Sequence, residues 1–268
     1  MPQRPHTASQ PQPLRAVVLG SGSSGNALAL CSGDDALLLD CGFSARETCR
    51  RLTAAGIEPS SVRAVLVSHE HSDHLRGVRV FASKHRLPVY LSRGTRAASG
   101  LDGLVPEVRM LSPGEPLAIC GVTVVPFRTS HDAAEPLGFR FEGLCGTVLG
   151  VLTDTGVVTP EALETLGGCN VLAVESNHDE RMLEHGPYPW FLKRRIASAE
   201  GHLSNRAAAK LVTALASDQL VRVVGVHLSS TNNTARLAND SLAAALAQLA
   251  HPAAVECASQ QEGCTLAG

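Results

Sequence analysis

The sequence of 268 residues contains no apolar run close to the roughly 20 residues that span a bilayer, so we expect no transmembrane helix. Its opening segment, Met1 to Pro13, is polar and proline-rich, and it lacks the apolar stretch of a secretory signal. A segment with so little apolar surface cannot offset the entropy lost on ordering, which predicts a disordered tail over residues 1–13. Without an export signal or a membrane segment, we expect a cytoplasmic protein.

The composition also lacks an excess of basic residues. The 23 Lys and Arg residues against 25 Asp and Glu residues give a net charge of −2, whereas a strongly basic balance would indicate a nucleic-acid partner. Any contact with nucleic acid must therefore come from a local patch. Two candidate patches are Lys193, Arg194 and Arg195, and the set Arg76, Arg79, Lys84 and Arg86. An ordinary solvated helix face explains either patch equally well.

Paired C-x-x-C cysteines are absent as well. The eight cysteines are scattered over the chain at positions 31, 41, 49, 120, 145, 169, 257 and 264. In a chain without an export signal, this pattern predicts reduced thiols that serve as small buried hydrophobic residues.

Short β-branched runs alternate with helical segments along the chain. Strands are predicted at 14–19, 27–31, 36–40, 62–67, 87–91, 122–129, 147–152, 171–174 and 221–226, and helices at 44–56, 75–86, 160–166, 188–198, 204–216 and 239–249. Because each half carries both strands and helices, we predict an α/β fold, a four-layer αββα sandwich of two mixed β-sheets. The halves meet near Gly121, but candidate site residues come from both, so we expect one domain over residues 14–268.

The segment Ser68-His-Glu-His-Ser-Asp-His74 directly follows a predicted buried strand. His69 and His71 are two residues apart, so in an extended loop both side chains can point the same way. Asp73 and His74 lie one turn further on and can point at a second position. Imidazole and carboxylate groups suit Zn²⁺, Mn²⁺ or Fe²⁺, and a chance cluster of solvated histidines with this spacing is rare. The segment therefore predicts a metal site.

One segment cannot complete two coordination shells, so further ligands must lie elsewhere. His131, Asp154 and His227 each follow a predicted strand, in that order. Any one of them alone fits an ordinary surface or core residue, but their serial placement after the first motif favours ligands.

Asp40, the His69–His74 motif, His131, Asp154 and His227 together resemble the ordered motifs of the metallo-β-lactamase superfamily. The resemblance implies that two divalent metal ions, Mn²⁺ or Zn²⁺, occupy the site. It implies one metal held by His69, His71 and His131, a second held by Asp73, His74 and His227, and Asp154 as the bridge. Asp40 would accept a hydrogen bond that orients a ligand, and Asp73 is predicted to be a catalytic residue as well as a ligand.

Glu175 and His202 resemble the Glu and Gly-His-Ser elements of the tRNA 3′-processing branch of this superfamily. The resemblance implies that they form a proton-donor pair for the departing alkoxide. A solvated carboxylate at a strand end is the plain alternative for Glu175, and a histidine in a capping loop is the plain alternative for His202.

Four segments together are similar to the YycJ/WalJ type of metallo-β-lactamase proteins, a family associated with 5′→3′ exonuclease activity on DNA. They are Leu19-Gly-Ser-Gly-Ser-Ser-Gly-Asn26, Ser68-His-Glu-His-Ser-Asp-His74, Gly201-His-Leu-Ser-Asn205 and His227-Leu-Ser-Ser-Thr-Asn-Asn233. Substrate contacts are predicted for Ser23, Asn26, Ser229, Asn232, Asn233, Lys193 and Arg194. A tight turn that lines the metal cleft and an ordinary polar loop are the plain alternatives for the first and last segments.

We therefore expect a dinuclear-metal phosphodiesterase that uses a metal-activated hydroxide, a 5′→3′ exonuclease acting on DNA in repair or metabolism. The partner would be nucleic acid, with DNA favoured over RNA. A small-molecule phosphodiesterase or thioesterase, an RNA-processing nuclease and a non-catalytic binding module of the same fold remain the alternatives. The residues do not distinguish Zn²⁺ from Mn²⁺, and they leave the oligomeric state open.

Overall fold

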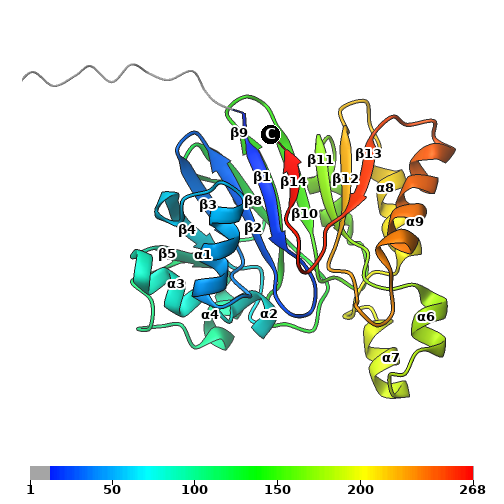
Figure 1. Ribbon diagram of the computed structural model, residues 1–268, viewed down its shortest axis with the longest axis horizontal. Coiled ribbons are helices and arrows are strands. Elements are labelled where there is room, and N and C mark those ends of the chain that lie inside the picture. Colours follow the sequence, from blue (N-terminus) through cyan, green and yellow to red (C-terminus); the bar gives the residue numbers. More distant parts are fainter. Residues whose placement is uncertain (1–12, 268) are drawn as a thin grey trace, which may run out of the picture.

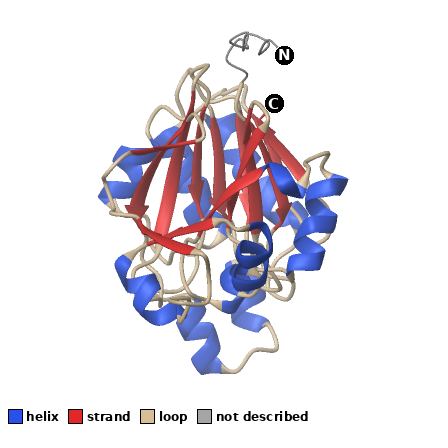
Figure 2. Ribbon diagram, turned by 90° about the vertical axis from the view of Figure 1, so that its left-hand side faces the viewer, coloured by secondary structure: helices blue, strands red, loops and turns tan. Residues whose placement is uncertain are grey.

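The computed structural model describes residues 13–267, and these form two seven-stranded sheets packed face to face (Figures 1 and 2). The first sheet has the order β14-β1-β2-β3-β4-β5-β6. Its strands are β1 (Arg15–Gly20), β2 (Ala27–Ser32), β3 (Asp35–Leu39), β4 (Val62–Leu66), β5 (Pro88–Leu91), β6 (Glu107–Met110) and β14 (Cys264–Ala267). Strands β3 to β6 run parallel, and β1 pairs antiparallel with both β2 and β14.

The second sheet has the order β13-β12-β11-β10-β9-β8-β7. Its strands are β7 (Leu117–Ile119), β8 (Val122–Arg128), β9 (Leu137–Gly143), β10 (Val148–Leu152), β11 (Val171–Glu175), β12 (Arg222–Val226) and β13 (Ala254–Cys257). Strands β10 to β13 run parallel, and β7 to β10 form an antiparallel meander. Each sheet is mixed, which confirms the predicted α/β sandwich.

Helices cover the outer faces of both sheets, as Figure 2 shows. The helices are α1 (Ala45–Ala54), α2 (Ser72–Leu75), α3 (Val78–His85), α4 (Arg93–Ser99), α5 (Pro160–Leu166), α6 (Glu180–His185), α7 (Trp190–Ile196), α8 (Asn205–Leu215) and α9 (Ala235–Gln248), with a 3₁₀ turn at Pro59–Ser61. Figure 1 shows α6 and α7 projecting beyond the lower end of the second sheet. No helix among residues 13–267 has the length and apolar character needed to cross a membrane.

Both faces of the central strands, such as β3, β10, β11 and β12, are buried, and this explains their nearly continuous apolar runs. In β3, Leu37 and Leu39 point into the core between the sheets, whereas Ala36 and Leu38 point towards the helices. A third cluster packs α5, α8 and α9 against the outer face of the second sheet. The three clusters correspond to the three interfaces of a four-layer sandwich, and burial of their apolar surface is the main force that holds the layers together.

Some local predictions were wrong. A single helix over 75–86 is interrupted at Gly77, because the Gly77 N–H donates to the Cys41 carbonyl at 2.7 Å. A Cβ at Gly77 would lie 2.0 Å from the Phe43 carbonyl oxygen, so the chain needs glycine at this close approach. The last helix begins at Ala235 rather than 239, where the Thr234 side chain accepts from Leu237 N.

The second sheet begins at β7, before the junction predicted near Gly121, and β14 returns to the first sheet. The predicted tail over residues 1–13 lies, apart from Pro13, outside the described residues. Burial raises the pKa of the Cys41 thiol to about 12 and that of Cys169 to about 11, in keeping with buried hydrophobic roles. Cys145, in contrast, is exposed, so the prediction of burial is wrong for that residue.

Candidate metal centre and catalytic cleft

The His69–His74 segment follows β4 and runs into the single turn of α2. The Asn26 N–H donates to the Asp73 carbonyl at 2.7 Å, and the Cys41 N–H donates to the His74 carbonyl at 2.8 Å. A Cβ at Gly42 would lie 1.6 Å from the Asp73 carbonyl oxygen, so only glycine permits this packing. The loops before β2 and after β3 therefore hold the segment by its backbone.

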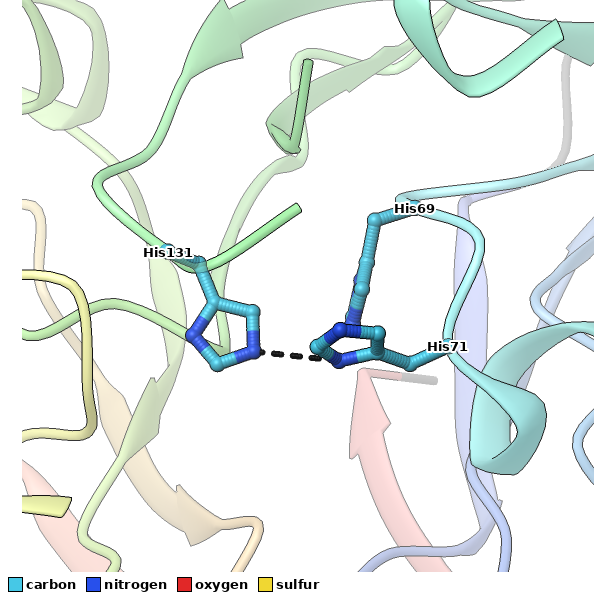
Figure 3. Close-up of side chains that lie close together, drawn as sticks. All are labelled: His69, His71 and His131. Carbon is cyan, nitrogen blue, oxygen red and sulfur yellow. Dashed lines mark hydrogen bonds between the residues drawn. The ribbon is translucent and has the colours of Figure 1, made fainter. Parts of the chain in front are cut away.

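His69, His71 and His131 form a first cluster, in which one nitrogen from each ring lies within 4.8 Å of the others. Figure 3 shows the three rings facing one another, with His131 contributed by the loop after β8. His71 Nε2 lies 3.2 Å from the Asp132 carbonyl, and His131 Nδ1 lies 3.0 Å from the Gly201 carbonyl. A carbonyl oxygen only accepts, so these two nitrogens carry the protons.

The remaining nitrogens, His71 Nδ1 and His131 Nε2, are then both lone-pair acceptors and face each other at 3.3 Å. Two nitrogens bound to one tetrahedral zinc ion, each at 2.0–2.1 Å, would lie about 3.3–3.4 Å apart. His69 Nε2 is buried and has no hydrogen-bond partner among residues 13–267. The donor set therefore fits a divalent cation, which would satisfy all three lone pairs at once.

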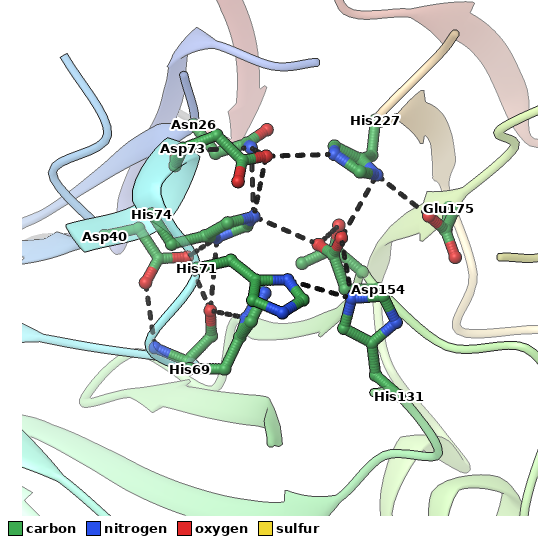
Figure 4. A network of polar contacts seen from close by, with 12 residues as sticks. Asn26, Asp40, His69, His71, Asp73, His74, His131, Asp154, Glu175 and His227 are labelled. Atoms are coloured by element: carbon green, nitrogen blue, oxygen red, sulfur yellow. Dashed lines mark hydrogen bonds and ion pairs between the residues drawn. The ribbon is translucent and has the colours of Figure 1, made fainter. Parts of the chain in front are cut away.

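Asp73, His74 and His227 form a second cluster, also within 4.8 Å (Figure 4). Asp73 Oδ2 lies 3.5 Å from both His74 Nε2 and His227 Nε2. His227 Nε2 is buried without a hydrogen-bond partner in the described part of the chain. This set likewise presents a carboxylate and two imidazole nitrogens to one point, which is a donor set that fits a divalent cation.

Asp154 lies between the two clusters. Its Oδ2 is 3.3 Å from His74 Nε2, and its Oδ1 is 3.9 Å from His131 Nε2 and 3.3 Å from His227 Nδ1. The carboxylate thus lies within 4 Å of imidazole nitrogens from both clusters, a position that suits a bridging ligand.

The backbone is left-handed at three strand ends in this region, with φ of 60° at Asp40, 53° at Asp154 and 54° at His227. Side-chain-bearing residues adopt this conformation at a cost, and such strain clusters at functional sites. Here it turns the backbone after β3, β10 and β12, where Asp154 and His227 join the candidate metal clusters and Asp40 contacts His74.

Asp40 is buried beneath the second cluster and accepts three hydrogen bonds. They come from Ser68 N at 2.8 Å, Ser68 Oγ at 2.9 Å and His74 Nδ1 at 2.7 Å. The contact with Nδ1 fixes the proton on that nitrogen and leaves His74 Nε2 directed at Asp73 and Asp154.

Burial and charge pull the pKa values in this cluster in opposite directions. Burial alone would raise the pKa of Asp154 and of Asp73, but the nearby His227 and His74 imidazoles lower both. Burial alone would lower the pKa of His227, but Asp154, Asp73 and Glu175 raise it to about 10. The carboxylates of Asp73, Asp154 and Glu175 therefore strongly favour a positive charge at the second cluster.

Glu175, at the end of β11, is fully buried and joins His202 to His227. Its Oε1 lies 2.8 Å from His202 Nδ1 and 2.9 Å from His227 Nδ1, and its Oε2 accepts from Thr155 N and Leu203 N. This burial rules out a solvated carboxylate. Although burial lowers the pKa of His202, Glu175 outweighs it and raises that pKa, which favours the protonated ring.

A cleft of about 290 Å³ adjoins the first cluster at His131, and His202 lines it as well. Ser23 and Ser229, two of the predicted substrate contacts, line the same cleft. Asn26 is instead buried among the candidate ligands, where its Nδ2 lies 3.0 Å from His74 Nε2 and 3.3 Å from Asp73 Oδ2.

The prediction that Asn232 and Asn233 contact substrate is wrong, because neither side chain reaches the surface. Asn232 is 0% exposed, and Asn233 is 5% exposed. Asn233 exchanges hydrogen bonds with Asn205 and donates to the carbonyls of Ser176 and Asn177. It stabilises the loop after β12 instead. Lys193 and Arg194 lie on α7 and line a separate cavity beyond His202.

Sequence reasoning missed Asp132 and the specific role of Arg195. Arg195 Nη2 lies 2.5 Å from Asp132 Oδ2, and Asp132 Oδ1 lies 3.3 Å from His131 Nε2. This ion pair ties α7 to the loop that carries His131. The only sequence signal was the basic run on the predicted helix, which does not identify the partner.

Three comparisons place these features among known proteins. The Beta-lactamase superfamily domain matches residues 36–228. Exodeoxyribonuclease YycJ of Bacillus anthracis is 38% identical over 232 residues, which cover 85% of this chain and 88% of that protein. Exodeoxyribonuclease WalJ of Streptococcus pneumoniae is 32% identical over 236 residues, which cover 86% and 87%.

Among solved structures, the metallo-β-lactamase fold protein YhfI from Bacillus subtilis aligns with a TM-score of 0.71 at 17% identity. The alignment covers 95% of this chain and 100% of that one. At such low identity the likeness establishes the fold alone.

Proposed function

This chain belongs to the metallo-β-lactamase superfamily and, within it, to the YycJ/WalJ family, and we propose that it is a metal-dependent 5′→3′ exonuclease acting on DNA. We further propose that the enzyme uses two divalent ions, Mn²⁺ or Zn²⁺. We place it in the cytoplasm, with a role in DNA repair or metabolism. Relatives named exodeoxyribonuclease at 38% and 32% identity over most of the chain support DNA over RNA as the substrate.

One ion would be held by His69, His71 and His131, and the other by Asp73, His74 and His227, with Asp154 between them. Charge favours cations at this position. Four carboxylates, those of Asp40, Asp73, Asp154 and Glu175, surround the clusters, and all but Asp73 are buried. Uncompensated buried charge is costly, and divalent cations would help to balance it.

Divalent cations held there would supply a nucleophile, by lowering the pKa of water, and would offset charge on the phosphodiester. The chain's own groups do the rest. His202 donates a proton to the departing oxygen from Nε2, because Glu175 occupies its Nδ1 at 2.8 Å. Ser23 and Ser229 line the cleft where the phosphate would lie, and their hydroxyls would donate to its oxygens.

The observation that carries the proposal is the position of His202. It lines the same cleft as the candidate ligand His131, and Glu175 links it to the candidate ligand His227. A proton donor beside a metal cluster is the arrangement that hydrolysis of a poor alkoxide leaving group requires.

The test is digestion of 5′-labelled and 3′-labelled DNA and RNA, single-stranded and duplex, with Mn²⁺, Zn²⁺ or EDTA. An Asp73→Ala variant serves as the control for a contaminating nuclease. We expect metal-dependent release of nucleotides from the 5′ end of DNA that the variant does not show. Release from the 3′ end would refute the polarity, and faster digestion of RNA would refute the substrate.

If metal analysis finds ions bound but no nucleic acid is cleaved, the nuclease proposal fails, and a small phosphodiester or a thioester becomes the substrate to test. Salt separates these classes, because contacts with many phosphates weaken steeply with ionic strength, whereas turnover of a small neutral ester does not. A protein without bound metal would indicate a non-catalytic member of the fold.

A further inference from the structure

A second cavity, of about 540 Å³, adjoins the first cleft at His202. His202 lines both spaces, so a substrate that spans them would pass the proposed proton donor. The walls of the second cavity include His178, Leu183, Trp190, Lys193 and Arg194. None of these residues belongs to the candidate metal clusters, and the cavity volume lies within the range of about 300–1,000 Å³ typical of small-ligand sites.

Helix α7 supplies an aromatic surface to this cavity. Trp190 is the only tryptophan of the chain and is 68% exposed, and α7 has no buried residue. The Arg194 guanidinium lies 5.5 Å from the centre of the Trp190 ring. A large aromatic ring held beside a cation, on a helix that projects from the body (Figure 1), leaves most of its apolar surface in water.

His178 adds a polar ring to the wall of this cavity. The residue is 3% exposed, lines the cavity, and its Nδ1 has no hydrogen-bond partner among residues 13–267. Buried polar atoms are normally paired, so this nitrogen is an exception, but it is itself closed to solvent. Burial lowers the pKa of His178, which favours the neutral ring, able to donate or accept a hydrogen bond.

The charges of the cavity favour a base over a phosphate as the group inside it. Glu180 and Glu184 also line the wall. Glu180 is occupied by Ser204 Oγ and by Arg206, whereas the Glu184 carbonyl accepts from Lys193 Nζ at 2.7 Å. Carboxylates repel a phosphate but can accept from the N–H groups of bases, including the N3–H of thymine. Lys193 and Arg194, in the same wall, carry the positive charge that suits the adjoining phosphates of the strand.

We propose that this cavity takes an unpaired nucleobase of single-stranded DNA, stacked on Trp190, while the adjoining phosphate lies in the cleft at His202. The proposal rests on the nuclease function above and specifies its substrate as a strand with unstacked bases. Stacking on an aromatic side chain does not depend on sequence, because every base has a π-face.

The position of α7 fixes the distance between base and phosphate. Arg195 pairs with Asp132 at 2.5 Å, and His202 N donates to the Ile196 carbonyl at 2.9 Å. These contacts connect the helix that carries Trp190 to the loops that carry His131 and His202. A base bound to α7 would therefore have a fixed position relative to His131 and His202.

Fluorescence provides a direct test, because Trp190 accounts for all tryptophan emission of the chain. The metal-loaded protein is titrated with a phosphorothioate oligo(dT), which resists hydrolysis, and with an abasic oligomer of equal length and charge. We expect quenching by oligo(dT) and little by the abasic oligomer. Equal responses to both, or no response to oligo(dT), would overturn the base site.

Variants provide the second test. Trp190→Ala should weaken oligo(dT) binding by about 5- to 150-fold, the range that corresponds to loss of one base stack. Trp190→Phe should restore most of the affinity. Phe191→Ala is the matched control, because Phe191 is 63% exposed on the same helix but is not part of the cavity wall. Melting temperature and metal content verify that each variant is folded and loaded.

The outcomes separate this inference from the proposed function. If Trp190→Ala binds and digests single-stranded DNA like the unchanged protein, the base site is refuted and the nuclease stands. If oligo(dT) quenches Trp190 but no nucleic acid is cleaved under any condition, the base site stands and the nuclease is refuted.

Discussion

Replacement of Asp40 by Asn tests the metal centre with almost no change of shape. Asp40 accepts three hydrogen bonds in a site that is 3% exposed, so water cannot replace a lost partner. The left-handed backbone, with φ of 60°, suits Asn as well as Asp, so the change adds no backbone strain. If the Asn oxygen keeps the bond from Ser68 N, the amide NH₂ faces His74 Nδ1.

Two N–H groups cannot face each other, so His74 must move its proton to Nε2, the atom that points at Asp73 and Asp154. A protonated Nε2 cannot bind a metal ion. Loss of such an orienting contact typically costs 10- to 100-fold in metal affinity, or about 1.4–2.7 kcal/mol. We expect a loss of that size for Asp40→Asn, measured by competition for Zn²⁺ and Mn²⁺ with a chromogenic chelator.

Asp35→Asn is the matched control. Asp35 accepts from Arg63 Nε at 2.6 Å on the surface, where an ion pair contributes little. We expect this variant to bind metal like the unchanged protein, and circular dichroism should show that both variants are folded. Metal affinity that is the same in Asp40→Asn and Asp35→Asn would refute the orienting role of Asp40.

Three further predictions concern the same site. His202→Ala should lower the turnover of DNA by about 10²- to 10⁴-fold at unchanged metal content, and an unchanged rate would exclude it as the general acid. Removal of divalent ions with EDTA should abolish hydrolysis and lower the melting temperature measured by calorimetry. A ligand present at 100 times its Kd adds about 2.7 kcal/mol to the free energy of unfolding. Equal melting temperatures with and without metal would contradict a metal site in the folded protein. Gly42→Ala should destabilise the fold by about 1–3 kcal/mol in urea titrations, because its Cβ would meet the Asp73 carbonyl at 1.6 Å. Gly167→Ala, with a nearest contact of 3.3 Å and φ of −56°, should cost much less.

The fold class was accessible from the sequence because its signals are local. The apolar runs of β3 and β4 and the spacing of His69 to His74 each fall within a few residues. Periodicity and turn residues encode such features directly. The break at Gly77 was missed because its cause, the Cys41 carbonyl, lies far away in the sequence.

The finer parts of the site depend on contacts that no short pattern contains. The choice of Nδ1 in His71 as the free nitrogen follows from the Asp132 carbonyl, 61 residues away. Asn233 looked like a substrate contact because it is polar and follows His227, but Asn205 draws it inwards. Polarity in a sequence does not reveal whether water or a buried partner satisfies the group.

The pairing of β14 with β1 affects the order in which a ribosome-bound chain can mature. Residues 264–267 leave the ribosome after every candidate ligand, yet they form β14, which pairs with one edge of β1. Until they arrive, β1 presents an unpaired edge, which is the kind of surface that drives association between nascent chains. Completion of the first sheet is therefore a late event in biogenesis, even though the strands that precede Asp40 and His69 are made early.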